Sequence, residues 1–177
     1  MTRSSDPFDP QDEDSIEDSD DEERDEQDAI SLLSADHAEV KQLFERYRQL
    51  VEGSAGEDRR SELAAQICSA LTVHAEIEED VFYPAMRDAL DDELLLDQAE
   101  VEHAAARDLI EQIESMDPGD ALYDAKVLVL GEYIDHHVQE EENEIFPQAE
   151  ASGIDLDTLG AELGERKREL MSELEED

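Results

Sequence analysis

The sequence predicts an all-α fold, an antiparallel up-down-up-down four-helix bundle, from three observations. Apolar residues recur at steps of three and four along long segments between residues 29 and 152. Short loops that contain glycines, prolines and helix-capping residues separate these segments. No segment alternates polar and apolar residues with a period of two, so we expect no strands.

Composition limits the class of protein. The chain has 177 residues and a net charge of −41, which opposes phosphate backbones and anionic membranes and favours cations. We therefore expect no nucleic acid and no membrane as partners. The single cysteine, Cys68, excludes an intramolecular disulfide and a cysteine-based zinc site. Without a membrane-length apolar run or a signal peptide, a soluble cytoplasmic protein is expected, with its oligomeric state left open.

The expected domains are three. Residues 1–28 carry nine Asp and five Glu against two Arg, and their scarce apolar residues predict a disordered acidic tail. Residues 29–152 form the four-helix bundle. Residues 153–177 carry leucines at helical steps and predict a short amphipathic C-terminal helix that packs on the bundle.

The first two helices of the bundle have clear signals at their ends. The first begins at Ala29, with Asp28 or Ser34 as its cap, and stops in the stretch 53–56, which holds two glycines. The second begins at Asp58 or Ser61 and runs to about residue 90. It passes Pro84, which should kink the helix or end it locally, because proline lacks the N–H donor.

The third and fourth helices follow the same pattern. The third presents one apolar face from Leu96 to Ile113 and closes at the turn formed by residues 116–119. The fourth begins near Tyr123 and ends at Gly153. Since the connections are short, each helix is expected to lie antiparallel to the next, an arrangement that builds metal sites from side chains on facing helices.

Two segments share one sequence frame. Residues 74–84 (HAEIEEDVFYP) and 136–147 (HHVQEEENEIFP) each place a histidine four residues before a glutamate and ten before a proline. Positions i and i+4 share a face of a helix, so His74 with Glu78, and His137 with Glu141, present an imidazole beside a carboxylate. This spacing is typical of metal ligands.

Four of the five histidines fall one to a helix, at positions where a core leucine would be expected: His37, His74, His103 and His137. A single histidine there is usually a buried neutral side chain with a hydrogen-bond partner. Four of them, with two glutamates on the same faces, would be costly to bury without a positive partner. A bound metal cation supplies that partner.

The two halves of the bundle repeat approximately. His37 follows Asp36, and His103, 66 residues later, follows Glu102. The second histidine of each half, His74 or His137, is offset by 63 residues. A pseudo-two-fold bundle would bring two equivalent half-sites together, and two metals bridged by two carboxylates fill them most simply. Imidazole and carboxylate ligands suit iron, manganese or zinc, and we expect a non-haem di-iron site first.

Residues 30–150 resemble the hemerythrin-like, or HHE cation-binding, domains. The resemblance rests on DHAEV in the first helix, VEHAAARDLI in the third and the two frames above. It implies two iron ions with an oxo or hydroxo bridge, with manganese or zinc possible, and reaction with dioxygen or a small oxidant. By position, the implied ligands are His37, His74, Glu78, His103, His137 and Glu141, with Glu142 as the alternative to Glu141.

Arg107 departs from the oxygen carriers of this family, which have a second histidine at that position. One ion would then keep an open or water-filled position, or recruit Glu102. The departure favours sensing, peroxide or nitrosative-stress chemistry, or iron handling over reversible oxygen carriage. Arg107 itself is expected to pair with Glu111 one turn on, with a place on the access path as the alternative.

Three functions remain. The first is a di-iron protein that binds or senses oxygen or redox signals, or handles iron, without fast turnover. A di-iron enzyme with peroxidase-like or ferroxidase activity is the alternative, and a metal-free interaction module ranks third. Tyr83, Tyr123 and Tyr133 are expected to be core or interface residues. Cys68 and His136 are expected to be structural, with His136 alternatively orienting a ligand.

Overall fold

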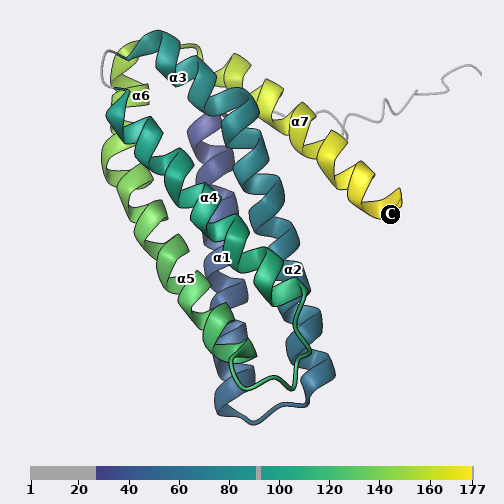
Figure 1. Ribbon diagram of the computed structural model, residues 1–177. Coiled ribbons are helices and arrows are strands. Elements are labelled where there is room, and N and C mark those ends of the chain that lie inside the picture. The colour runs from purple at the N-terminus through teal and green to yellow at the C-terminus, as the bar shows by residue number, and fades with distance from the viewer. Residues whose placement is uncertain (1–26, 91–92, 177) are drawn as a thin grey trace, which may run out of the picture.

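The computed structural model describes residues 27–90 and 93–176, and these contain helices and no strand. Figure 1 shows the elements, whose bounds are α1 (Ala29–Glu52), α2 (Glu57–Ile77), η1 (Glu78–Phe82), α3 (Tyr83–Ala89), α4 (Leu94–Glu114), α5 (Tyr123–Glu140), η2 (Glu141–Ile145), α6 (Phe146–Ser152) and α7 (Leu156–Glu176). The predicted all-α bundle is confirmed. The disorder predicted for residues 1–28 falls on residues outside the described part, apart from Gln27 and Asp28.

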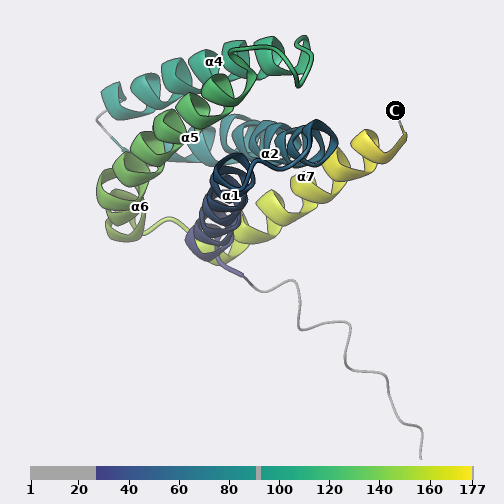
Figure 2. The ribbon, with the colours of Figure 1, turned by 90° about the horizontal axis from the view of Figure 1, so that it is seen from below.

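The bundle is made of α1, α2, α4 and α5, which lie side by side with neighbours in sequence antiparallel (Figures 1 and 2). The short helices α3 and α6 extend α2 and α5 at one end of the bundle, and the loops 53–56 and 115–122 lie at the other end (Figure 1). The topology is therefore up-down-up-down, as the short connections predict.

Helix ends follow the predicted signals in most places. Asp28 caps α1, and its Oδ1 accepts a 2.9 Å hydrogen bond from the backbone N–H of Ser31. Gly53 follows the last turn of α1, and Gly153 ends α6 in the left-handed conformation with φ 78°. The second helix begins at Glu57 after Gly56, earlier than predicted, with acidic Glu57 and Asp58 in its first turn.

Both frames contain a π-helical turn, which the sequence did not predict. The backbone N–H of Tyr83 donates to the carbonyl oxygen of Glu78, five residues back, and that of Phe146 donates to Glu141. Pro84 and Pro147 follow directly and have no N–H for an α-helical bond. The helix therefore neither stops nor breaks at the proline; it widens for one turn before it and then continues as α3 or α6.

The apolar core is divided in two. The proline-end core lies where α3 and α6 meet, and includes Leu33, Ile77, Phe82, Met86 and Phe146. The loop-end core lies towards the loops 53–56 and 115–122, and includes Phe44, Tyr47, Ile67, Ile110 and Leu130. The four core histidines fall between the positions that the two cores occupy along the helices.

The C-terminal helix α7 packs on the bundle and then departs from it. Its Leu159, Leu163 and Leu170 are buried in the proline-end core. Gly160 allows close approach to the start of α1, since a Cβ atom there would clash with the carbonyl oxygen of Gln27. Figures 1 and 2 show the C-terminal end of α7 pointing away from the four long helices.

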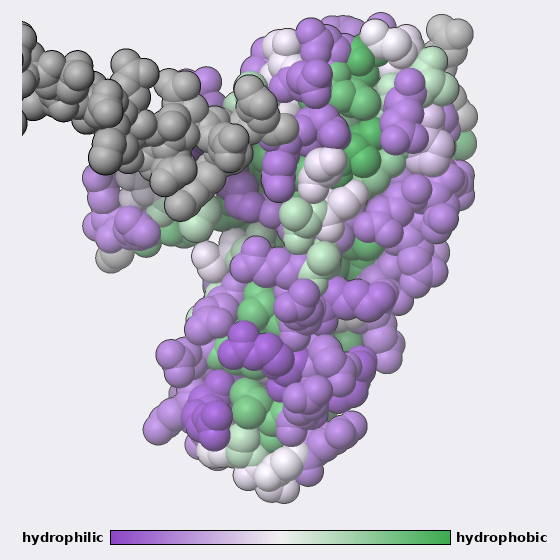
Figure 3. Space-filling model, turned by 180° about the vertical axis from the view of Figure 1, so that it is seen from behind, coloured by the Kyte–Doolittle hydropathy of each residue, from purple (hydrophilic) through white to green (hydrophobic). Residues whose placement is uncertain are grey.

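The surface is largely hydrophilic on the face that Figure 3 shows, with narrow hydrophobic strips between polar side chains. Within the ranges 27–90 and 93–176, no helix is both long and apolar enough to cross a membrane. Within the described residues, the buried charged and ionisable side chains gather in one place: Asp36, His37, His74, Glu78, His103, His137 and Glu141.

Candidate metal centre

The six predicted ligands converge in the middle of the bundle, where they form what we call the centre. His37 comes from α1, His74 from α2, His103 from α4 and His137 from α5, while η1 and η2 contribute Glu78 and Glu141. The histidines are 3–6% exposed and both glutamates are 0% exposed. Burial of so many ionisable groups in an apolar bundle requires that they neutralise one another or a bound cation.

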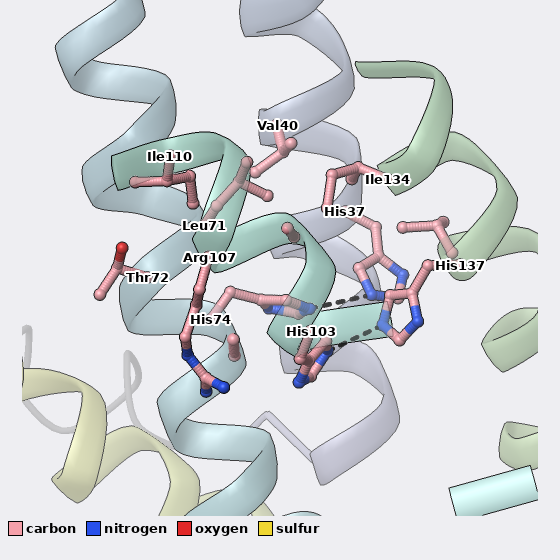
Figure 4. A pocket seen from close by; sticks show the side chains of 13 residues that line it. His37, Val40, Leu71, Thr72, His74, His103, Arg107, Ile110, Ile134 and His137 are labelled. Atoms are coloured by element: carbon pink, nitrogen blue, oxygen red, sulfur yellow. Dashed lines mark hydrogen bonds between the residues drawn. The ribbon is translucent and has the colours of Figure 1, made fainter. Parts of the chain in front are cut away.

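The histidines form two pairs whose Nε2 atoms face each other. The distance between these atoms is 3.1 Å for His37 and His74, and 3.0 Å for His103 and His137 (Figure 4). The pairs define two halves of the centre, the His37/His74 half on α1 and α2 and the His103/His137 half on α4 and α5. This is the pseudo-two-fold arrangement that the sequence repeat predicts.

The two glutamates contact both halves. Glu78 lies 3.2 Å from Nε2 of His74 through Oε1 and 3.3 Å from Nε2 of His103 through Oε2. Glu141 Oε2 lies 3.2 Å from Nε2 of His37 and 3.4 Å from Nε2 of His137. Glu78 Oε1 and Glu141 Oε2 are nevertheless buried without a hydrogen-bond partner. The two unpartnered carboxylate oxygens thus lie beside three of the four Nε2 atoms, those of His37, His74 and His137.

Each histidine is held from behind by a carboxylate at Nδ1. The distances are 3.0 Å from His37 to Glu142, 3.4 Å from His74 to Asp36, 2.9 Å from His103 to Glu79 and 2.8 Å from His137 to Glu102. We call Asp36, Glu79, Glu102 and Glu142 the outer carboxylates. Because an ionised carboxylate only accepts hydrogen bonds, Nδ1 carries the proton and a neutral ring turns its Nε2 lone pair inward.

This geometry fits a cation in each half. Two nitrogens that bind one ion at about 2.1 Å and at right angles lie about 3.0 Å apart. The observed pair distances of 3.1 Å and 3.0 Å match that separation. The donor atoms also fall into two groups within ligand distance of one another, one made of His37, His74, Glu78 and Glu141 and the other of Glu78, His103 and His137.

Electrostatics point the same way. Burial lowers the pKa of His74, but Glu78 and Asp36 outweigh it and raise that pKa to about 10. Burial also lowers the pKa values of His37 and His103, but Glu141 beside His37 and Glu78 beside His103 outweigh it, so both pKa values are raised. Burial raises the pKa of Glu78, yet His74 and His103 hold it well below its usual range. The centre therefore demands positive charge, as protons or as metal.

Tyr83 makes the two halves different. It occupies the frame position of Phe146, and each ring stacks on one histidine at a centroid distance of 5.6 Å, Tyr83 on His103 and Phe146 on His37. The Tyr83 hydroxyl donates a 2.8 Å hydrogen bond to Glu141 Oε1 and lies 3.5 Å from Glu78 Oε2. Burial and the nearby glutamates raise the pKa of this hydroxyl well above its usual value, so it remains a donor.

The prediction that Tyr83 is only a core residue is therefore incomplete. At about 3.6 residues per turn, a residue nine positions after His74 would lie on the opposite side of an α-helix. The π turn η1 contains more residues per turn and brings Tyr83 back towards the centre. The tyrosine directly before Pro84 was the sequence signal that could have identified it.

Arg107 pairs with Glu79 and not with Glu111, so the predicted pairing along its own helix is wrong. Its Nη2 donates a 2.6 Å hydrogen bond to Glu79 Oε2, while the other oxygen of Glu79 holds His103. The guanidinium reaches across to η1 because a buried histidine already fixes the carboxylate there. Arg107 thereby becomes part of the support of His103.

A small cavity, partly open to solvent, lies against the imidazoles. All four core histidines line it together with Arg107 and Thr72, as Figure 4 shows, and its remaining lining side chains are apolar: Val40, Leu71, Ala75, Ala106, Ile110, Ile134 and Val138. Arg107 thus lines the space beside the imidazoles, and its alternative placement on an access path stays a prediction. A small molecule in this cavity would meet the imidazole side of the centre in a largely apolar space.

The remaining predicted residues have distinct places. Glu141 lies inside the centre, whereas the side chain of Glu142, its alternative as a ligand, is 44% exposed and supports His37 from outside. The side chain of His136 is 67% exposed and lies near Glu102 and Glu140. Glu102 does not enter the inner donor set; it holds Nδ1 of His137.

Comparison with known proteins agrees with this fold and centre. The family model described as the hemerythrin HHE cation binding domain matches residues 28–149. A solved crystal structure of a hemerythrin HHE cation binding domain-containing protein from Mycobacterium kansasii superposes with a TM-score of 0.69, at 22% identity, over 83% of this chain and 89% of that chain. At that identity the likeness concerns the fold alone.

A curated protein also matches. A DNA nickase from Nostoc sp. PCC 7120 is 31% identical over 119 residues, which are 65% of this chain and 31% of that protein. The chain thus spans about a third of the length of this relative. The family match covers more than half of the chain and contains all six residues of the centre. The chain belongs to the hemerythrin HHE cation-binding domain family.

Proposed function

We propose that this protein holds two metal ions, iron first, and uses them to bind or sense dioxygen, peroxide or a related small oxidant. The observation that supports this most directly is the pair of buried, unpartnered carboxylate oxygens, Glu78 Oε1 beside Nε2 of His74 and Glu141 Oε2 beside Nε2 of His37 and His137. His37 with His74 would hold one ion and His103 with His137 the other. Glu78 and Glu141 would bridge them, since each contacts both halves.

Iron in such a site supplies one-electron redox chemistry and coordination positions for a small oxidant. The chain's own groups have three tasks around it. The outer carboxylates fix the tautomer and orientation of the imidazoles and raise their basicity. The apolar side chains of the cavity exclude bulk water and limit the size of a ligand. The Tyr83 hydroxyl holds Glu141 and keeps a proton beside it.

Manganese or zinc also suits imidazole and carboxylate donors, so metal identity needs a direct measurement. The deciding experiment is elemental analysis of the purified full chain, with optical spectra of the anaerobically reduced protein before and after oxygen. We expect close to two irons per chain and near-ultraviolet absorption that appears on oxidation. A metal-free protein from iron-replete cells would contradict the proposal.

An enzyme on the same centre is the second candidate. The Tyr83 hydroxyl, 2.8 Å from Glu141, favours it because a proton donor beside a redox centre assists peroxide or oxygen reduction. Consumption of peroxide or oxygen with added ferrous iron separates the two. A sensor reacts in proportion to its centres and stops, whereas a peroxidase-like protein or a ferroxidase continues.

Activity on DNA is not carried over from the Nostoc nickase, because the chain spans 31% of it. A net charge of −41 opposes binding to a phosphate backbone or an anionic membrane. We propose instead that dioxygen or a small oxidant is the partner of the centre, in the cytoplasm. Buried Cys68, whose pKa is raised to about 12 by burial, is an unreactive thiol and suits that compartment.

A further inference from the structure

Helix α7 lies outside the matched residues 28–149, yet one of its side chains reaches the support of the centre. The Nζ of Lys167 donates a short hydrogen bond to Oδ1 of Asp36. The other oxygen of Asp36 lies 3.4 Å from Nδ1 of His74. One carboxylate therefore connects the C-terminal helix to a proposed metal ligand.

The contact is more than a surface ion pair. The side chain of Asp36 is 11% exposed and that of Lys167 is 28% exposed, so both charges are partly withdrawn from water. Without Lys167, Asp36 would keep its burial and lose the positive charge of this ion pair.

We infer that Lys167 is a positioning residue of the metal centre, and that docking of α7 and metal binding in the His37/His74 half stabilise each other. The inference rests on the proposed function. Lys167 holds Asp36 in place, and Asp36 orients His74 so that its Nε2 points inward. Any group that strengthens the hydrogen bond from His74 to Asp36 therefore also strengthens the attachment of α7, because coupling between two sites is reciprocal.

The neighbouring residue provides a matched control. Arg166 on the same helix donates a 2.9 Å hydrogen bond to Asp80 of η1. The side chain of Asp80 is 49% exposed, and within residues 27–90 and 93–176 its ion pair is with Arg166, not with a histidine. Arg166 and Lys167 thus attach the same helix to the same bundle, but of the two only Lys167 contacts a carboxylate that holds a proposed ligand.

The variants should remain folded. Leu159, Leu163 and Leu170 keep α7 in the proline-end core whatever residue occupies position 167. Figures 1 and 2 show that α7 crosses the bundle near α1 and α2 before its C-terminal end departs from it. A weaker attachment of α7 should therefore affect this terminal helix and leave the four-helix bundle in place. Local opening of a terminal helix is measurable by hydrogen exchange without global unfolding.

The experiment compares the full-length wild type with Lys167→Gln, Lys167→Arg and Arg166→Gln, each loaded with iron anaerobically and metal-free. Hydrogen–deuterium exchange of peptides from α7 reports docking, and competition with a chelator reports metal affinity. In the wild type, metal should slow exchange of α7 on the order of tenfold. Lys167→Gln should abolish that difference and weaken metal binding by a similar factor, and Lys167→Arg should restore most of both.

Arg166→Gln should speed exchange of α7 equally with and without metal and leave metal affinity unchanged. Equal exchange of α7 in the loaded and metal-free wild type overturns the inference, as does the same loss of affinity in both Gln variants. Elemental analysis of the wild type separates this outcome from failure of the proposed function. A wild type with two ions but an indifferent α7 overturns the inference alone, and a wild type without metal overturns both.

Discussion

The two halves of the centre have the same donors and different surroundings. Each half takes one histidine from each of two paired helices and contacts both glutamates. Around them, Tyr83 stacks on His103 where Phe146 stacks on His37. Lys167 binds Asp36, whereas the equivalent Glu102 has the exposed His136. Helical spacing repeated along the chain fixes the donors, and single side chains outside that repeat make the halves chemically unequal.

The largest expected effect comes from removing one ligand of either half. His74→Ala and the equivalent His137→Ala should each lose at least one ion per chain, as measured by elemental analysis. Because Glu78 and Glu141 contact both halves, we expect the remaining ion to bind more weakly as well. His136→Ala is the control, since its exposed side chain leaves the donors intact. Full metal content in His74→Ala would exclude it as a ligand.

Neutralising equivalent outer carboxylates should lower metal affinity by different amounts in the two halves. Asp36→Asn and Glu102→Gln keep size and remove charge, and loss of such a support typically costs 10–100-fold in metal affinity. Asp36→Asn should have the larger effect, because its side chain is 11% exposed against 30% for Glu102 and because it would also leave Lys167 without its ion pair. Chelator competition measures both. Equal losses would mean that α7 adds nothing to its half.

The sequence predicted the donors because they obey local rules. Residues four apart share a helix face, so His74 with Glu78 and His137 with Glu141 are neighbours in any helix that contains them. A polar residue on an apolar stripe must be buried, which also placed His37 and His103 inside. The same stripe separated buried Glu141 from Glu142, which the structure places on the outer side of His37.

The unpredicted features depend on distant contacts or on non-standard helix geometry. Arg107 with Glu79 and Lys167 with Asp36 are separated by 28 and 131 residues, so no spacing rule connects them. Tyr83 was missed because a constant helical period cannot represent the π turn η1. Most of the asymmetry between the halves is carried by these contacts. Sequence repeats therefore showed what the halves share more readily than what distinguishes them.

Removing the Tyr83 hydroxyl should make the halves more alike. Tyr83→Phe gives both halves a phenylalanine and leaves buried Glu141 without its 2.8 Å hydrogen bond. An unsatisfied buried acceptor costs about 1–3 kcal/mol. The free energy of unfolding of the metal-free variant, measured with urea, should therefore be lower than that of the wild type by that amount. Tyr133→Phe is the control, because Tyr133 is 54% exposed. A variant as stable as the wild type would show that the hydroxyl bond contributes little.

The smallest effect concerns the helices that begin the halves. Asp28 caps α1, whereas Glu93 before α4 makes no capping side-chain bond. Asp28→Ala should therefore cost about 1 kcal/mol of unfolding free energy near neutral pH and Glu93→Ala close to none, both measured in metal-free protein. Hydrogen bonds from Ser31 lower the pKa of Asp28 below its usual value in the folded state. Because its folded pKa is depressed, the Asp28 carboxylate stabilises the folded protein fully above its unfolded pKa and loses this contribution as pH falls through its folded pKa. The penalty of Asp28→Ala should shrink over that pH range. A penalty independent of pH would show that the charge of the cap does not matter.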